Sequence, residues 1–344
     1  MDMDIIALLN ELTNVAGLTG FETDIAEHAA SMLEEFCENV AIAKSKSVVA
    51  DVKTMDSSKK TLMIEAHLDR IGLMVSEICE NGFIRVKALG GVDERILPGS
   101  ECFILGKKTV YGVIGAVPPH LLKKEDKKAV KMSDIIVDTG LGEESKDLIS
   151  VGDPILLKSD FCTLVDGKIS SAAIDNRAGM AAVLLMLEKL KGKELPVNLK
   201  ITFASGEELG LLGARTLAME ECPDLAVVVD VTHGQTHDAK AEGTFVLGSG
   251  VEICRGPNLH YDATNKIIEI AKDKNIPFEI EVASGNTGTN AWVIQTLEKG
   301  IACALLSVPI RYMHTTVETV DVRDIESAAE LLAQVVLKGG DLFA

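Results

Sequence analysis

The spacing of hydrophobic residues predicts alternating helices and strands over most of the chain. Residues 22–40 carry apolar side chains at helical spacing, and residues 61–66 form a short apolar run typical of a buried strand. After residue 167, long helical patterns and apolar strands alternate up to about residue 337. This alternation predicts an α/β fold with a mostly parallel sheet flanked by helices.

The pattern changes between residue 71 and about residue 160. Here short runs alternate apolar and polar positions, and glycine-rich turns separate them, which predicts a small β-barrel-like domain. We therefore expect one α/β domain, formed by residues 1–70 and 161–344, into which residues 71–160 are inserted. No internal repeat or low-complexity tract interrupts this organisation.

Composition and charge narrow the classes of function. The chain has 344 residues, with 34 Lys and Arg against 52 Asp and Glu, so its formal net charge is −18. Such a charge has the wrong sign for a general partner of nucleic acid or of an anionic membrane. Apolar runs fall far short of the ~20 residues that span a bilayer, and the start lacks the basic region of a signal peptide, so a cytoplasmic protein is expected.

Cysteines and lysines give weaker signals. Seven cysteines are scattered without CxxC spacing, and we expect free thiols. A basic segment is predicted to be a solvated or interface loop; its lysines are Lys123, Lys124, Lys127, Lys128 and Lys131.

Metal-binding side chains follow several of the predicted strands. In open α/β sheets, ligands bind outside the carboxyl ends of the strands, so these side chains are expected to converge on one crevice. Two imidazoles and three carboxylates suit a pair of divalent metal ions that share one carboxylate. The candidates are His67 and Asp69 after 61–66, Glu207 and Glu208 after 197–204, Asp230 after 227–229, His314 after 304–308, and Asp175 before a long helix.

Each candidate also has a purely structural interpretation when it is taken singly. Asp175 could cap its helix, Asp230 could be a turn residue at a strand end, and His67 could be a core histidine. The adjacent pair Glu207 and Glu208 could be a solvated helix start. The joint placement of all these residues at strand ends favours the metal site.

Five segments of the chain carry these candidates or lie beside them, at residues 66–72, 174–179, 206–210, 230–232 and 311–315. In sequence and in order, they resemble segments of the M42 family of metallopeptidases. This family comprises tetrahedral-shell aminopeptidases that have also been labelled glutamyl aminopeptidase or endoglucanase. The resemblance covers nearly the whole chain, including the inserted β domain.

The resemblance implies a role for each candidate. Residues 1–70 and 161–344 would be the catalytic domain, which would bind two divalent ions, zinc with cobalt or manganese as alternatives. Glu207 would be the general base and Asp69 would orient a ligand imidazole. The bond between Asp175 and Asn176 would be cis. The implied ligands are Asp175 as the bridge, His67 and Asp230 at one ion, and Glu208 and His314 at the other.

The implied activity is an aminopeptidase that removes N-terminal residues from short peptides. The implied assembly is a homo-oligomer, a tetrahedral dodecamer to which the β insertion contributes contacts. Two residues depart from the family pattern, Arg70 after the His-x-Asp segment and Asn290 in place of a common aspartate. We expect both residues near the substrate side of the crevice. In the alternative interpretation, Arg70 forms an ion pair at the surface and Asn290 caps the helix that follows it.

Three other functions remain open at this stage. A deacylase or carboxypeptidase of related fold would use the same pair of metal ions with a different specificity pocket. A glucanase needs two carboxylates and usually aromatic platforms, yet the chain has one Trp and 4% aromatic residues. A metal-binding assembly protein without activity is the third alternative, although every implied ligand and the general base are present.

Overall fold

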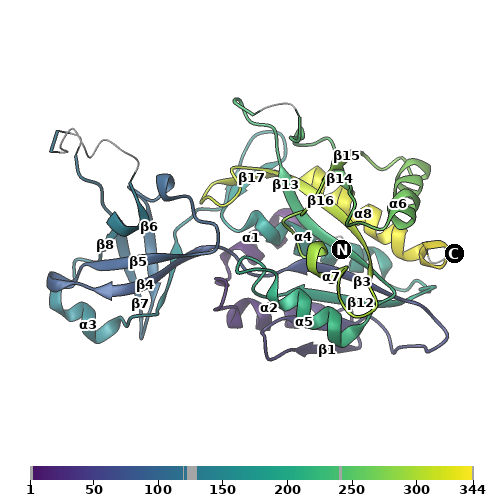
Figure 1. The fold of residues 1–344 in the computed structure, drawn as a ribbon, viewed down its shortest axis with the longest axis horizontal. Coiled ribbons are helices and arrows are strands. Elements are labelled where there is room, and N and C mark those ends of the chain that lie inside the picture. The colour runs from purple at the N-terminus through teal and green to yellow at the C-terminus, as the bar shows by residue number, and fades with distance from the viewer. Residues whose placement is uncertain (1–2, 119, 122–129, 240–241, 343–344) are drawn as a thin grey trace.

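The structure is a computed structural model that describes residues 3–118, 120–121, 130–239 and 242–342. Figure 1 shows a small barrel on one side of the molecule and a larger α/β part on the other. Four lysines of the basic segment, at positions 123, 124, 127 and 128, lie outside the described residues. All seven cysteines are free, as expected, although Cys162 and Cys222 are exposed rather than buried.

One sheet of eleven strands forms the centre of the α/β part. Its order is β1-β2-β12-β3-β13-β16-β17-β11-β10, and β14 pairs with both β15 and β16. The strands are β1 (Asn39–Ile42), β2 (Val48–Asp51), β3 (Thr61–His67), β10 (Cys162–Thr163), β11 (Lys168–Ser171), β12 (Asn198–Ala204), β13 (Leu225–His233), β14 (Val251–Arg255), β15 (Phe278–Val282), β16 (Ala302–Arg311) and β17 (Glu318–Asp321).

The middle of the sheet is parallel and its margins are antiparallel. Strands β12, β3, β13 and β16 run parallel to one another, whereas β1, β2, β17, β11 and β10 pair in antiparallel fashion. The predicted α/β class with a mostly parallel sheet is therefore confirmed. Parallel strands joined by helices end at the same edge, which gathers the residues that follow them.

Helices bury both faces of the sheet. On β3, Leu62 and Ile64 join a core with α1, α2, α4, α6 and α8, whereas Met63 faces a second core with α5 and α7. Because side chains alternate along a strand, two apolar faces explain why these strands read as continuous hydrophobic runs. The helices are α1 (Ile5–Asn14), α2 (Thr23–Leu33), α3 (Ser145–Leu148), α4 (Ile174–Leu190), α5 (Leu212–Glu221), α6 (Tyr261–Asp273), α7 (Ala291–Ile294), α8 (Val322–Leu337) and α9 (Gly339–Leu342).

The barrel closes in the order β4-β5-β8-β7-β6-β9. Side chains that alternate along its strands, such as Leu73 and Val75, fill a core separate from those of the α/β part. Strand β8 has only three residues, too few to show the alternation of apolar and polar positions from which the barrel was predicted. The strands are β4 (Gly72–Ile78), β5 (Ile84–Leu89), β6 (Glu101–Leu105), β7 (Thr109–Ile114), β8 (Ile136–Asp138) and β9 (Pro154–Leu157).

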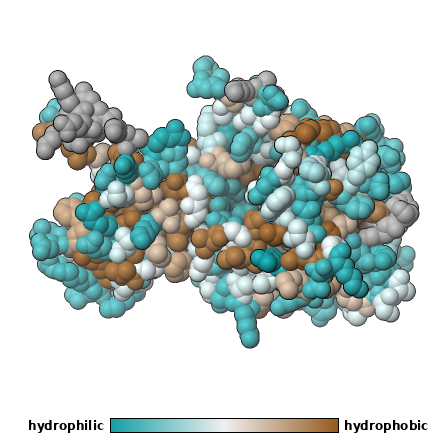
Figure 2. Space-filling view, in the orientation of Figure 1, coloured by the Kyte–Doolittle hydropathy of each residue, from teal (hydrophilic) through white to brown (hydrophobic). Residues whose placement is uncertain are grey.

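Polar and charged residues are spread over the face of the molecule in Figure 2, and hydrophobic residues gather on the barrel and across the middle. Among the described residues, no helix combines the length and the apolar character that a membrane crossing requires.

Candidate metal centre and active site

Asp175 lies between the two predicted histidines. Its Oδ1 is 3.0 Å from Nε2 of His67, and its Oδ2 is 3.3 Å from Nε2 of His314. The two oxygens of one carboxylate thus face two different imidazoles. The peptide bond from Asp175 to Asn176 is cis, as predicted.

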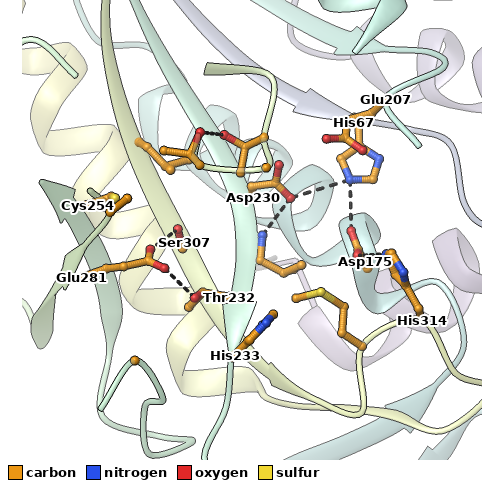
Figure 3. Close-up of a pocket in the computed structure, with 18 of the residues that line it drawn as sticks. His67, Asp175, Glu207, Asp230, Thr232, His233, Cys254, Glu281, Ser307 and His314 are labelled. Atoms are coloured by element: carbon orange, nitrogen blue, oxygen red, sulfur yellow. Dashed lines mark hydrogen bonds and ion pairs between the residues drawn. The ribbon is translucent and has the colours of Figure 1, made fainter. Parts of the chain in front are cut away.

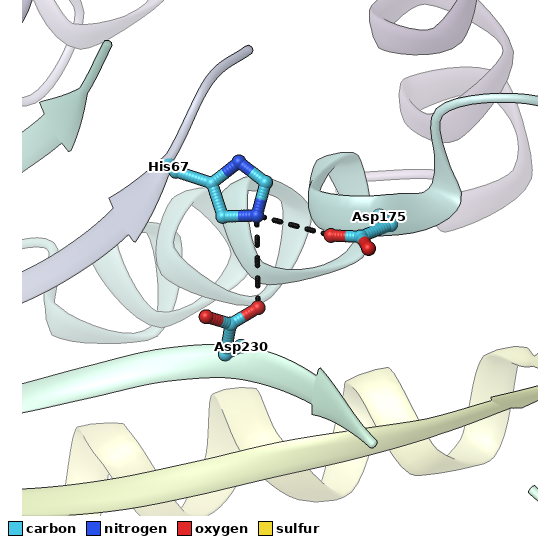
Figure 4. Close-up of side chains that lie close together, drawn as sticks. All are labelled: His67, Asp175 and Asp230. Carbon is cyan, nitrogen blue, oxygen red and sulfur yellow. Dashed lines mark hydrogen bonds and ion pairs between the residues drawn. The ribbon is translucent and has the colours of Figure 1, made fainter. Parts of the chain in front are cut away.

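Each histidine also faces a second carboxylate. Nε2 of His67 lies 3.6 Å from Oδ1 of Asp230, and Figure 4 shows His67 pointing between Asp175 and Asp230. Nε2 of His314 lies 3.2 Å from Oε1 of Glu208. The five predicted ligands therefore form two groups that share Asp175, and in each group the candidate ligand atoms lie within 4.8 Å of one another.

The donor set and the charge of this site fit divalent cations. Imidazole nitrogens and carboxylate oxygens suit zinc, cobalt or manganese. Burial opposes a positive charge on His314, yet Asp175 and Glu208 outweigh it and raise the pKa of His314 to about 11. Burial, together with the charges of Asp230 and Glu208, raises the pKa of Glu207 to about 9. A concentration of negative charge of this kind attracts cations.

Asp69 holds the loop that carries Glu207 and Glu208. The two oxygens of Asp69 accept hydrogen bonds from the backbone N–H groups of these residues, at 3.0 and 3.1 Å. The Asp69 carboxylate lies 3.5 Å from Nδ1 of His67, while the Asp69 backbone oxygen is closer, at 3.1 Å. Fully buried Asp69 therefore contacts both the loop and the imidazole.

Glu318 is a buried carboxylate that the sequence analysis missed. Its Oε2 accepts a hydrogen bond from the backbone N–H of Asp175 at 3.1 Å, and its Oε1 accepts one from His314 N–H at 2.7 Å. One side chain of β17 thus connects the backbones of two candidate ligands. No motif signals this residue, because Glu318 in the short run Glu318–Asp321 looks like an ordinary strand residue.

The barrel part of the chain also reaches the site. Nδ1 of His314 lies 3.0 Å from the backbone oxygen of Gly91, which follows β5. A Cβ at Gly91 would lie only 2.8 Å from that nitrogen, and a Cβ at Gly90 would lie 3.3 Å from a Glu208 oxygen. The close approach of this loop therefore depends on the two glycines.

Arg70 and Asn290 do not lie where they were predicted. Arg70 is 6% exposed and Asn290 is fully buried, and neither lines the cavity of the site. Asn290 Nδ2 donates a hydrogen bond to Oε1 of Glu65, a buried acid on β3, at 2.8 Å. Asn290 stands at the start of α7 but makes no side-chain capping bond, so both alternatives for these residues are also wrong. For Asn290 the reason is that Glu65, buried on β3, offers it a hydrogen-bond acceptor away from the cavity.

Strand β13 extends beyond its predicted limit. Strand β13 continues to His233, so Asp230 lies inside the strand and not at its end. Its pairing with β3 nevertheless stops at Val228, two residues earlier. Val228 pairs with Glu65, so the same register puts Asp230 level with His67, the last residue of β3, which is why Asp230 reaches His67.

A cavity of about 320 Å³ opens beside these side chains. Figure 3 shows His67, Asp175 and His314 on one side of it and Glu281 with Ser307 on the other, with Asp230 between them. Glu207 and Glu208 also line it. The cavity is large enough for part of a small organic substrate, and it presents that substrate to both candidate ligand groups.

Comparison with known proteins places the chain in a family. The model of the M42 glutamyl aminopeptidase family matches residues 47–331. A lysyl aminopeptidase of Pyrococcus furiosus is 31% identical over 331 residues, which cover 94% of each chain. A glutamyl aminopeptidase of Lactococcus lactis is 27% identical over 347 residues, covering 97% of this chain and 96% of the relative.

Solved structures agree with this result. A TET aminopeptidase from a marine sediment thaumarchaeote superposes with a TM-score of 0.92 at 27% identity, covering 97% of this chain and 96% of the other. The TET1 peptidase of Pyrococcus horikoshii, described as able to assemble into a tetrahedron or a large octahedral shell, gives 0.86 at 28% identity, with coverages of 97% and 100%. M42 peptidases depend on metal ions, and the two ligand groups described above match that dependence. This chain therefore belongs to the M42 family of aminopeptidases and is a hydrolase.

Proposed function

We propose that this enzyme removes N-terminal residues from short peptides with the help of two divalent metal ions. The observation that carries the proposal is the placement of Asp175, whose two oxygens face His67 and His314 at 3.0 and 3.3 Å. One carboxylate in this position can join two metal ions. The two imidazoles face different oxygens of this carboxylate, which favours two ions over one.

The ligands divide between the two ions. His67 and Asp230 would hold one ion and Glu208 and His314 the other, and Asp175 would be shared between them. Zinc is the proposed ion, with cobalt or manganese as alternatives, because mixed imidazole and carboxylate ligands suit all three. When bound, such ions make water more acidic and polarise the scissile carbonyl.

Glu207 is the proposed general base. It lines the cavity beside the ligand groups, and Asp69 fixes its backbone. Glu207 takes a proton from the attacking water and delivers it to the leaving amine. Because Glu207 is not a proposed metal ligand, this transfer leaves the metal ligands unchanged. Asp69 acts through position, because its carboxylate contacts the Glu207–Glu208 backbone and the ring of His67.

The two parts of the fold have separate proposed roles. Residues 1–70 and 161–344 form the catalytic domain, and residues 71–160 form an insertion that serves assembly and substrate access. We propose a homo-oligomer, a tetrahedral dodecamer, in line with the assembly described for the TET1 peptidase. Sedimentation of the purified protein as a monomer would contradict this assembly.

The activity is tested with aminoacyl amides that have free or acylated N-termini. Enzyme stripped of metal by a chelator is expected to lose hydrolysis and to regain it with zinc, cobalt or manganese. Cleavage restricted to free N-termini supports the aminopeptidase, whereas cleavage of N-acylated substrates would support a deacylase of related fold.

Glu207→Gln tests the general base separately. The change removes a proton acceptor but no ligand, so bound metal is retained while kcat falls by ~100-fold or more. Glu220→Gln, an exposed position on α5, is the matched control and should keep full activity. Undiminished turnover in the Glu207 variant would refute the proposed role.

A further inference from the structure

Glu281 is the acidic residue of the cavity that the proposed chemistry does not use. Five acidic side chains line this cavity within the described part of the chain. Three of them are proposed ligands and Glu207 is the proposed base. No Lys or Arg among the described residues lines the cavity to form an ion pair with Glu281.

Two buried hydroxyl groups fix the orientation of Glu281. Thr232 Oγ1 donates to Glu281 Oε1 at 2.7 Å, and Ser307 Oγ donates to Glu281 Oε2 at 3.0 Å. Thr232 and Ser307 are 6% and 1% exposed. A carboxylate has about four acceptor positions, so two such bonds leave it able to accept others from a ligand.

The same two hydroxyl groups tie Glu281 to the metal ligands. Thr232 follows Asp230 by two residues on β13 and so projects from the same face, about 7 Å further along the strand. Ser307 is the register partner of Asp230 on the neighbouring strand β16, about 4.8 Å away. Glu281 therefore lies past the ligand site and on the same side of the sheet, as Figure 3 shows.

Part of the cavity wall is apolar or weakly polar. Cys254, Ala283 and Leu305 line the cavity that Glu281 shares with the proposed ligands. A side chain that starts at the metal site would pack its methylene groups inside this cavity and place its end at the carboxylate. Long side chains with an aliphatic stem and a cationic end match such surroundings.

We propose that Glu281 determines specificity by binding the cationic side chain of an N-terminal lysine or arginine. The ammonium or guanidinium group donates hydrogen bonds to the Glu281 carboxylate, while Thr232 and Ser307 hold that carboxylate in place. This inference rests on the proposed aminopeptidase function. It names the substrate class of the same site, peptides with a basic N-terminal residue.

Substrates that differ only in the terminal charge give the direct test. Fluorogenic amides of lysine and norleucine have stems of similar length, and only lysine carries the ammonium group. Wild-type enzyme loaded with zinc is expected to show kcat/KM at least ~10-fold higher for lysine, the size of effect that a hydrogen bond to a charged group supplies. Free lysine should also inhibit more strongly than free norleucine.

Glu281→Gln keeps the shape of the side chain and removes its charge. This variant should lower kcat/KM for the lysine amide by ~10-fold or more and leave the norleucine amide nearly unchanged. Glu281→Asp keeps the charge and should retain part of the preference, which a merely structural role would not explain. Glu279→Gln, an exposed position on the same strand, is the control and should preserve the wild-type ratio.

The possible outcomes separate this inference from the function on which it rests. A wild-type preference for norleucine or glutamate would overturn the inference and leave the aminopeptidase intact. Equal losses on lysine and norleucine amides in Glu281→Gln would also overturn it, since the carboxylate would then bind the α-amino group. Failure to cleave any free-terminus amide after metal restoration would overturn the proposed function and the inference together.

Discussion

Glu318→Gln removes one of the two acceptors that connect the candidate ligands Asp175 and His314. In the wild type, the two carboxylate oxygens each accept one backbone N–H, at 3.1 and 2.7 Å. Glutamine offers one oxygen, and its amide nitrogen cannot accept a hydrogen bond. One of the two buried N–H groups therefore loses its partner.

The expected loss follows from this unpaired group. A buried donor without an acceptor costs about 1–3 kcal/mol, which corresponds to about 5-fold to 150-fold in a binding constant. The two N–H groups belong to Asp175 and His314, which are both candidate ligands. We therefore expect the loss to appear as weaker metal binding, in the range of ~10–100-fold that residues behind metal ligands typically contribute.

Competition with a chromogenic chelator measures this affinity for zinc. Glu326→Gln, an exposed position on α8, provides a matched control that should bind zinc like the wild type. Thermal unfolding of both variants shows whether the fold is retained. A Glu318→Gln protein that binds zinc within twofold of the wild type would refute the argument.

Two further predictions concern the barrel contact and a buried acid. Gly91→Ala would place a Cβ 2.8 Å from Nδ1 of His314, so we expect it to weaken zinc binding and kcat/KM, whereas Gly115→Ala, where no atom lies within 4 Å of the new Cβ, should leave both unchanged. Glu252 is fully buried with no hydrogen bond to either oxygen, and burial raises its pKa to about 10. Because the folded state then holds a proton that the unfolded state releases above pH 4.5, Glu252 lowers stability as pH rises from about 4.5 to 10. Urea unfolding at pH 6 and pH 9 should show a smaller loss of stability for Glu252→Gln than for the wild type or for the exposed variant Glu279→Gln; equal losses in all three proteins would contradict the assignment.

The candidate ligands could be predicted from the sequence because they follow strong local patterns. His67 follows the mostly apolar run 61–66, and Glu207 and Glu208 follow another strand. Parallel strands end at one edge of the sheet, so a one-dimensional pattern placed these side chains near one another. The structure agrees with that placement, because the centre of the sheet is parallel and the candidate ligands form two groups that share Asp175.

The residues that support the ligands could not be predicted from local sequence patterns. Glu318, Glu65 and Asn290 work through partners distant in the sequence, such as the 225 positions that separate Asn290 from Glu65. Only the three-dimensional register brings them together. The hydrogen bond between Asn290 and Glu65 also explains why Asn290, which was expected on the substrate side of the crevice, is buried instead.

Short or edge strands were missed for a related reason. Residues 22–40 read as one helix, yet α2 ends at Leu33 and Val40 belongs to the edge strand β1. Strand β14 carries the buried acid Glu252 within only five residues, which breaks its hydrophobic pattern. These strands are specified by their neighbours, β2 for the first and β15 with β16 for the second.

The contact between the Gly91 carbonyl and His314 has a consequence for engineering and for comparison among relatives. A domain that only recruits subunits could be deleted, or exchanged for that of another peptidase, without harm to the chemistry. Here the inserted barrel supplies the acceptor for the ring nitrogen of His314 that faces away from Asp175 and Glu208. A chimera must therefore carry residues 90–91 together with the catalytic part, and the functional border between the two units lies inside the barrel sequence.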